Sequence, residues 1–266
     1  MPPNQLPPEF EAHQPAIEEA LQSAFSLPKD SQLPLYLMMR YQLGWVDQTG
    51  DPSPHHVDRV LGAFCAEAAS SLEASAVAVS GAAAIELLGE SIQTHEDMQS
   101  GSQQRGGRDA VWWVWGPAQA INAGDGLHAL GRTTMMRLAQ NGVPAEKVLK
   151  AVRSLDLACL ALCEGQYMDL QFQDQMLVSV ADYMDMIGRK AGAIAACATE
   201  SGALTAGASD EDCGIFSEVG RRMGMAWQIS RDIDDLWGEH GDGMTPSNVL
   251  NKKKSLPLVH TLENAD

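Results

Sequence analysis

The sequence predicts one all-α domain built as a bundle of helices. Strand patterns, in which Val, Ile and Tyr alternate with polar residues, are nearly absent, whereas Ala, Leu, Met, Glu and Gln dominate the chain. The 266 residues suffice for one large domain or two small ones and can bury a sizeable core. No short-period repeat is visible, so a solenoid is not favoured. Helices in such a bundle can carry inward-facing ligands.

The elements follow in order from the spacing of apolar residues and from the turn residues between them. The first 14 residues are Pro-rich and polar and are predicted to be flexible, so the domain covers residues 15–266. A turn-rich connector is expected at 44–56 and a loop at 100–109. The predicted helices cover residues 15–44 with an interruption at "LPKDSQLP", 57–98 with a break at "EASAV", 116–140, 145–173, 179–203 and 210–239, before a Gly-rich loop at 238–248 and a last helix that opens at 251.

The charge balance limits the kind of partner. The chain has 18 Lys and Arg against 35 Asp and Glu, a formal net charge of −17. This excess of acid argues against a general nucleic-acid binder, which needs a basic face to meet phosphates. A small anionic substrate is not excluded, because a few cations or a metal can reverse the local field.

Five scattered cysteines, an odd number in mostly apolar surroundings, indicate reduced, buried thiols of a cytosolic protein. Cys159 and Cys163 share a helix face, but no His or Cys cluster accompanies them, so zinc is not expected. The N-terminus does not have the pattern of a signal peptide, and no apolar run approaches the roughly 18–20 residues of a spanning helix. We therefore expect a cytoplasmic protein without a transmembrane segment.

The richest acidic stretch is "WQISRDIDDLWGE" at 227–239. Residues three or four apart share a helix face, so Gln228, Asp232 and Asp235 form one stripe. Carboxylates and an amide on one face suit a hard cation such as Mg²⁺. The alternative is a solvated ion-pair network around Arg231, and the spacing leaves both interpretations open.

A second acidic pair, Glu96 and Asp97, precedes a Gly-Ser loop, and no carboxylate follows at the next helical turn. Alone, such a pair is typical of a solvated helix end, and His95 of a structural histidine. Arg105 and Lys190, taken singly, are typical of surface charges. The aromatic Trp227 fits a core position or the wall of a cavity that faces a cation.

Taken together and in order, these stretches resemble the trans-isoprenyl diphosphate synthase (polyprenyl synthetase) family from about residue 36 onward. The resemblance implies an all-α bundle around a deep central cavity, usually a homodimer. It also implies two Asp-rich motifs that use Mg²⁺ to ionise an allylic prenyl diphosphate, to which isopentenyl diphosphate is then added. The matching stretches are "AAAIELL", "HEDMQ", "QQRGG", "WGPAQAINAGD", "CEGQYMDL", "YMDMIGRKAGA", "GRRMGMAWQISRDIDDLWGE" and "KKKSLPLVHTLE".

The resemblance assigns roles to residues whose motifs are altered here. The first Asp-rich motif falls on residues 96–100 and keeps two acids; the second falls on 231–235, where Arg231 replaces the first acid. Arg231 can take the place of one metal charge, because guanidinium pairs well with phosphate oxygens. The implied Mg²⁺ ligands are Glu96, Asp97, Asp232 and Asp235, and the three aspartates among them are also expected to be catalytic. The residues implied to bind the diphosphate are Arg105, Lys190, Gln228 and Arg231. The residues implied to line the cavity are Gln93 and Trp227.

The residues that the family uses for isopentenyl diphosphate are largely missing. The second arginine of the family falls on Gly106, the histidine before the first motif on Gly89, and the late loop lysine near Met244. The Gly-Lys-Arg segment expected near 52–59 reads "PSPHHVDR". A diphosphate without cationic partners would be desolvated without compensation, so binding of this extender is expected to be lost.

Three functions are compatible with this pattern. The leading interpretation is a terpene synthase-like enzyme that ionises a prenyl diphosphate without condensing it with isopentenyl diphosphate. The first alternative is a non-catalytic subunit in a heteromer with an intact synthase chain, and the second is a chain-elongating prenyltransferase. In the enzyme readings, the acids would hold Mg²⁺ on the leaving diphosphate while Arg105 and Lys190 offset its growing charge.

Overall fold

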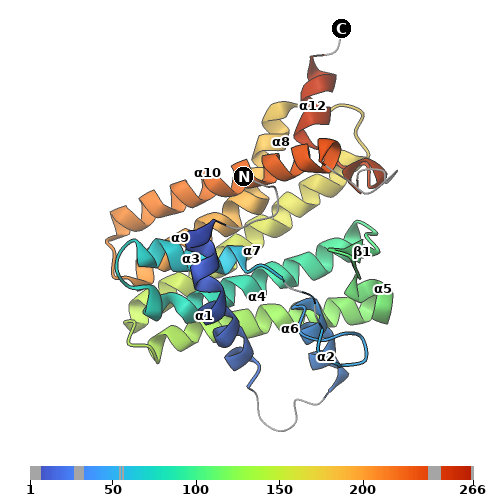
Figure 1. The fold of residues 1–266 in the computed structure, drawn as a ribbon. Coiled ribbons are helices and arrows are strands. Elements are labelled where there is room, and N and C mark those ends of the chain that lie inside the picture. The colour runs from blue at the N-terminus through green and yellow to red at the C-terminus, as the bar shows by residue number, and fades with distance from the viewer. Residues whose placement is uncertain (1–6, 27–32, 54, 56, 239–246, 265–266) are drawn as a thin grey trace.

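The computed structural model describes residues 7–26, 33–53, 55, 57–238 and 247–264. Helices make up nearly all of this part of the chain, which confirms the predicted all-α class (Figure 1). The helices are α1 (Pro8–Ala24), α2 (Pro34–Gln42), α3 (Val60–Ser70), α4 (Ser75–Gln99), α5 (Val111–Trp115), α6 (Pro117–Met136), α7 (Ala145–Gln173), α8 (Val180–Ile187), α9 (Ala193–Thr205), α10 (Asp210–Trp237), α11 (Ser247–Leu250) and α12 (Leu256–Glu263).

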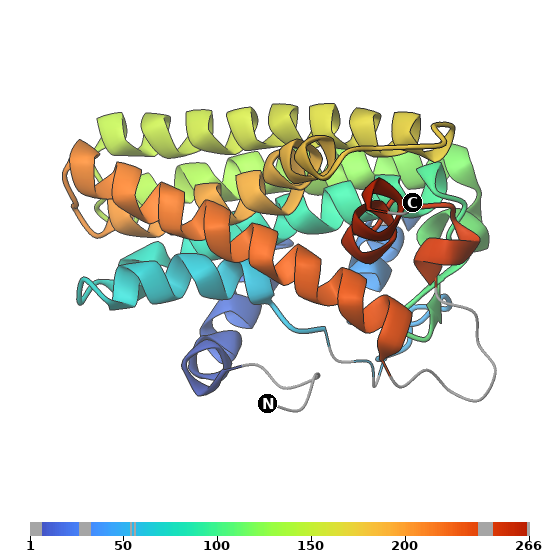
Figure 2. The same ribbon diagram turned by 90° about the horizontal axis from the view of Figure 1, so that it is seen from above.

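Helix α4 lies at the centre, packed against α1, α3, α6 and α9 (Figures 1 and 2). Its run from Ala82 to Leu88, in which Glu86 is the one charged residue, is buried on all sides because helices surround it. Small residues let the neighbouring helices approach closely: a Cβ at Gly202 of α9 would overlap the backbone of Cys65 in α3. This dense core fixes the ends of α4, α7 and α10, and those ends carry the charged side chains of the site.

The same helix α4 qualifies a prediction made from composition. It is the helix within the described ranges that is long and apolar enough to cross a membrane, with a mean hydropathy of 1.3 over the qualifying window. Because 56% of that window is buried against the rest of the protein, α4 is accounted for as the core helix of the bundle.

Several boundaries differ from the sequence-based expectations. Helix α1 begins at Pro8 rather than at residue 15, because proline is compatible with the first turn of a helix, and so residues 8–14 are helical where a flexible segment was predicted. The first six residues and most of the predicted Gly-rich loop at 238–248, including Met244, lie outside the described residues. Helix α7 occupies the predicted range 145–173.

Two further differences concern the site. The predicted helix 179–203 is divided by a π-helical turn, Gly188–Gly192, between α8 and α9. The predicted loop 100–109 contains a short hairpin of β1 (Gln104–Arg105) and β2 (Arg108–Asp109), turned by two glycines with positive φ, Gly106 and Gly107. The hairpin and the π-helical turn each present one basic side chain to the same pocket, as described next.

Candidate functional site

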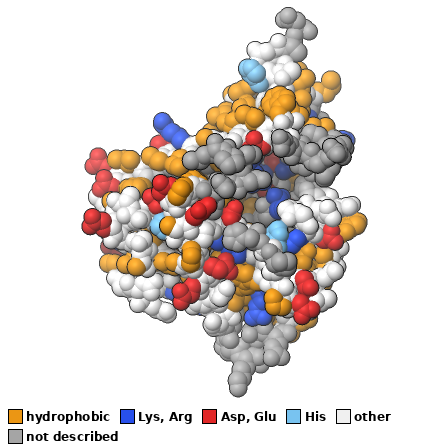
Figure 3. Space-filling view, viewed as in Figure 1, with side chains coloured by type: hydrophobic (Ala, Val, Ile, Leu, Met, Phe, Trp, Pro, Cys, Tyr) orange, Lys and Arg blue, Asp and Glu red, His pale blue; other side chains and the backbone are white. Residues whose placement is uncertain are grey.

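A pocket of about 290 Å³ lies where the C-terminal half of α4 meets α7, α8, the π-helical turn and α10. Lys and Arg side chains gather in a hollow on the face seen in Figure 3. The apolar lining consists of Leu61, Ile92, Leu162, Met186, Ile187 and Ile194. The charged lining consists of the cations Arg105, Lys190, Arg231, Lys253 and Lys254 and the carboxylates Glu96, Asp169, Asp232 and Asp235.

Lys190 lies on the π-helical turn and joins α4 to α7. Its Nζ is 2.7 Å from Glu96 Oε1 and 2.9 Å from Asp169 Oδ2, and it donates a 2.7 Å hydrogen bond to Gln166 Oε1. Burial opposes ionisation of Glu96, but the charges of Lys190, Lys253 and Arg105 outweigh it and lower its pKa to about 2. Glu96 is therefore a carboxylate at neutral pH, already compensated by the protein. A π-helical turn inside a helix is a common feature of functional sites.

The absence of a side chain at Gly165 of α7 leaves the space that the Lys190 side chain occupies. An added Cβ at this glycine would lie 2.6 Å from Lys190 Cγ and 3.0 Å from Arg189 Cβ. Any larger residue would therefore displace the lysine stem or the π-helical turn.

Arg105 on β1 forms an ion pair with Asp97. Its Nε donates to Asp97 Oδ1 at 2.7 Å and its Nη2 approaches the same oxygen at 2.6 Å, while the Gln93 amide lies 3.4 Å away. Asp97 is only 2% exposed and is not part of the pocket lining. Burial raises its pKa, and Arg105 offsets part of that effect. The structure thus places Asp97, predicted to be catalytic and a metal ligand, behind Arg105.

Asp232 of α10 is a buried acceptor for three donors. Its Oδ2 accepts from the Tyr183 hydroxyl at 2.7 Å and from the Leu256 backbone N–H at 3.1 Å, and its Oδ1 accepts from the Gln228 amide at 2.9 Å. Asp232 is only 4% exposed, and these hydrogen bonds replace the contacts with water that its carboxylate loses on burial. Burial and the carboxylate together raise the pKa of Tyr183. Asp232 thereby ties α8 and the start of α12 to α10.

Arg231 and Asp235 complete the α10 side of the pocket. The guanidinium of Arg231 lies 5.6 Å from the ring centroid of Trp227, a cation–π contact. Within the described ranges, no carboxylate or carbonyl forms an ion pair or hydrogen bond with it. Asp235 Oδ2 accepts from the Asn248 backbone N–H at 2.9 Å. Trp227, like Gln93, lines the pocket as a cavity residue is expected to.

The four predicted Mg²⁺ ligands do not fit a common divalent cation in this arrangement. Glu96 and Asp97 are paired with separate basic side chains, and Asp232 accepts three hydrogen bonds. Among the described residues, no group of three or more His, Cys, Asp or Glu side chains is arranged to hold a metal ion. The metal roles remain predictions of the sequence.

Sequence reasoning missed residues that complete the pocket. Asp169 is 5% exposed and pairs with Lys190, and Lys253 lies 3.9 Å from the same carboxylate. The sequence does contain patterns that could have indicated these residues. Gly165 and Asp169 are four residues apart in "GQYMD" and so share one face of α7, and Lys253 belongs to the basic run "NKKKS". His95 is structural, as expected, because its ring lies against Gly124 and within 3.3 Å of the Ile121 carbonyl oxygen.

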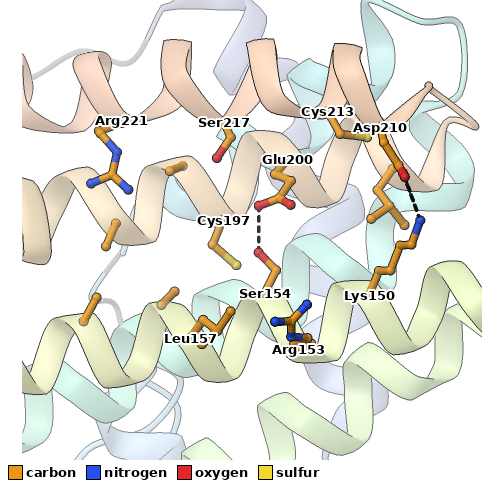
Figure 4. A pocket seen from close by; sticks show the side chains of 15 residues that line it. Lys150, Arg153, Ser154, Leu157, Cys197, Glu200, Asp210, Cys213, Ser217 and Arg221 are labelled. Atoms are coloured by element: carbon orange, nitrogen blue, oxygen red, sulfur yellow. Dashed lines mark hydrogen bonds and ion pairs between the residues drawn. The ribbon is translucent and has the colours of Figure 1, made fainter.

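A second cavity of about 400 Å³ opens between α7, α9 and α10 (Figure 4). Its walls include the hydrogen bond from Ser154 to Glu200 at 2.8 Å and the ion pair between Lys150 and Asp210 at 2.9 Å. No residue assigned to the site from the sequence lines this cavity. The candidate site is therefore the smaller pocket, where the predicted residues converge.

Comparisons with known proteins find relatives of one kind. A family model described as polyprenyl synthetase matches residues 58–266. The chain is 33% identical over 237 residues to a geranylgeranyl diphosphate synthase of Mycobacterium tuberculosis, an alignment that covers 87% of this chain and 66% of the relative. It is 34% identical over 183 residues to a geranylgeranyl diphosphate synthase of Sulfolobus acidocaldarius, which covers 68% of this chain and 55% of that one.

A solved structure is similar over almost the whole chain. The crystal structure of a polyprenyl synthetase from Streptomyces coelicolor superposes with a TM-score of 0.87 at 32% identity, covering 97% of this chain and 75% of that one. The chain thus spans 55% to 66% of the length of the two synthases named above. The family model, the two relatives and the shared fold together establish that this chain belongs to the polyprenyl synthetase family.

Proposed function

We propose that the chain binds an allylic prenyl diphosphate in the pocket between α4, α7 and α10 and transfers its prenyl group as a prenyltransferase. The observation that carries the proposal is the mixed lining: five basic side chains, four carboxylates and several apolar side chains face the same pocket. A prenyl diphosphate has both a multiply charged head and a hydrocarbon tail. Pockets of this kind use a few polar groups to orient a mostly apolar ligand.

In this proposal the basic side chains act on the head group. Lys190, Arg231 and Lys253 line the pocket and would offset the negative charge that grows on the leaving diphosphate. The fixed network of Lys190 with Glu96 and Asp169 keeps the ammonium in place before the ligand arrives. Preorganised charge of this kind requires little rearrangement at the moment of reaction.

The apolar side chains act on the tail and on the developing cation. Ile92, Leu162 and Ile194 come from three different helices, and each adds an apolar side chain to the wall of the pocket. Such a wall excludes water, which would otherwise capture a carbocation. The ring of Trp227 also lines the pocket and contacts the Arg231 guanidinium through its face.

The transfer step is proposed by analogy with the relatives, whose names describe synthesis of geranylgeranyl diphosphate. In that reaction the bond between the allylic carbon and the diphosphate oxygen breaks, and a bond forms to the terminal alkene carbon of isopentenyl diphosphate. Loss of a proton then restores the double bond. The product is a prenyl diphosphate longer by one five-carbon unit.

A second candidate function is ionisation of the prenyl diphosphate without addition of isopentenyl diphosphate. It is favoured by the residues at the positions where the resemblance places the binding site for isopentenyl diphosphate. An added Cβ at Gly89 would overlap Leu61 Cδ1, so a larger side chain at this position needs Leu61 to move. Arg59, inside the segment 52–59, is 2% exposed and donates to Glu18 at 3.0 Å and to the Leu43 carbonyl oxygen at 2.7 Å. These residues support a terpene synthase-like reaction, because they offer the extender few cations.

One assay separates the candidates. The protein is incubated with Mg²⁺ and geranyl, farnesyl or geranylgeranyl diphosphate, with and without isopentenyl diphosphate, and pyrophosphate release and product length are measured. A longer prenyl diphosphate is the expected product of the prenyltransferase. Pyrophosphate release with no longer product indicates the second candidate. Activity only after addition of an intact synthase chain indicates a heteromer subunit, and no binding of any prenyl diphosphate refutes the proposal.

Assembly and location belong to the same proposal. Leu149, Leu160 and Tyr167 are exposed and lie along one stripe of α7, which supports the homodimer implied by the resemblance. Light scattering after gel filtration tests this: a dimer is expected, and a monomer at micromolar concentration contradicts it.

We propose a cytoplasmic location, because the family resemblance and the reduced cysteines both favour it.

A further inference from the structure

We infer that this pocket holds a diphosphate without a divalent cation, with Arg231 supplying the positive charge on the α10 side. The inference rests on the proposed function, because it concerns how the same head group is bound.

The α10 side has few carboxylate oxygens free to receive a cation. Asp232 accepts hydrogen bonds from the Tyr183 hydroxyl, the Leu256 backbone and the Gln228 amide. A cation that took those oxygens would leave two or more buried donors unsatisfied, which is costly. Asp235 already accepts from the Asn248 backbone N–H.

The α4 side is neutralised in the same way. Glu96 Oε1 lies 2.7 Å from Lys190 Nζ, and Asp97 Oδ1 lies 2.6 Å from Arg105 Nη2. Asp97 also lies outside the pocket lining. A divalent cation bridging these two acids through the same oxygens would compete with both basic partners.

Arg231 supplies the charge that such a cation would bring. A guanidinium at a position where the resemblance expects a carboxylate changes the local charge by two units, the charge of one divalent ion. Arg231 lines the pocket, and its guanidinium donors have no ion-pair or hydrogen-bond partner among the described residues. Its planar fork can make two parallel hydrogen bonds to phosphate oxygens. Lys253 and Lys254 line the same pocket and add to its positive field.

The test is calorimetric titration with farnesyl thiolodiphosphate, an analogue that resists ionisation, in excess EDTA and again in millimolar Mg²⁺. The wild-type protein is expected to bind with about the same affinity in both buffers. Arg231→Gln is expected to weaken binding by about 10- to 100-fold in both, the range of a lost charge-assisted contact. Arg231→Asp, which introduces the carboxylate, is expected to bind weakly in EDTA and to recover in Mg²⁺.

Arg222→Gln is the matched control, because Arg222 is an exposed arginine on the same helix that pairs with Glu218 and does not line the pocket. It should bind as the wild-type protein does, and circular dichroism melting confirms that each variant is folded. Wild-type binding that disappears in EDTA overturns the inference and leaves the proposed function standing. No wild-type binding in either buffer refutes the proposed function itself.

Discussion

Replacing Lys190 with methionine removes the cation that lies within 3 Å of both Glu96 and Asp169. The side chain of Glu96 is 18% exposed and that of Asp169 is 7%, so two nearly buried carboxylates lose their common partner. In the wild-type protein the pKa of Glu96 is lowered from 4.5 to about 2, with Lys190 the largest favourable cause. By linkage, this lowering corresponds to about 3 kcal/mol of stability at neutral pH. Breaking a buried pair by removing one partner typically costs about 3–5 kcal/mol, which agrees.

Urea unfolding at pH 7 measures this cost directly. We expect the free energy of unfolding of Lys190→Met to fall by about 3 kcal/mol, and adding Glu96→Gln to recover part of the loss, because the two residues are coupled. A depressed carboxyl pKa stabilises the fold above pH 4.5, and this contribution is lost as the pH falls toward 2. The difference between wild type and variant should therefore shrink in acid. A difference below about 0.5 kcal/mol at pH 7, the range of ordinary surface substitutions, would refute the reasoning.

Three further predictions follow from single contacts. Gly165→Ala should displace Lys190 and weaken the binding of farnesyl thiolodiphosphate measured by calorimetry. The control is Gly214→Ala, which should bind as the wild-type protein does, because an added Cβ there meets nothing within 4 Å. Equal affinities of the two variants would contradict the predicted effect of Gly165→Ala. Burial raises the pKa of Glu86 from 4.5 to about 7, so the free energy of unfolding should fall by about 3 kcal/mol between pH 4.5 and 8, and urea titrations of Glu86→Gln should lack this fall. Asp232→Asn leaves a donor of Asp232 unsatisfied and should lower the free energy of unfolding by about 1–3 kcal/mol; an unchanged urea midpoint would contradict this.

The helical bundle was predictable from the sequence because local signals are strong and consistent. Helix α7 matches its predicted range because Pro144 precedes its first residue and its periodic apolar pattern runs unbroken to Gln173. The π-helical turn at Gly188–Gly192 was not predictable, because its apolar spacing continues that of the flanking helices. The early start of α1 was missed because a run of prolines usually indicates an extended segment.

Most residues predicted for the site line one pocket, but Asp97 does not, and the sequence did not predict which side chains pair with each other. Arg105, Lys190 and Arg231 do line one pocket, as the resemblance implied. Sequence order cannot say which acid meets which base, because such pairs depend on contacts between residues distant in the chain. Asp97 was expected to face the ligand, yet the hairpin after α4 turns Arg105 back onto it. Asp169 was missed because a lone acid on a long helix is usually solvated.

A crystal structure of the protein with farnesyl thiolodiphosphate would show where the head group and the tail bind. The account predicts the diphosphate in the pocket of α4, α7 and α10, within hydrogen-bonding distance of Arg231 and Lys190, with the tail along Ile92 and Ile194. Density for the ligand in the cavity between α7, α9 and α10, or a head group away from both basic side chains, would contradict it.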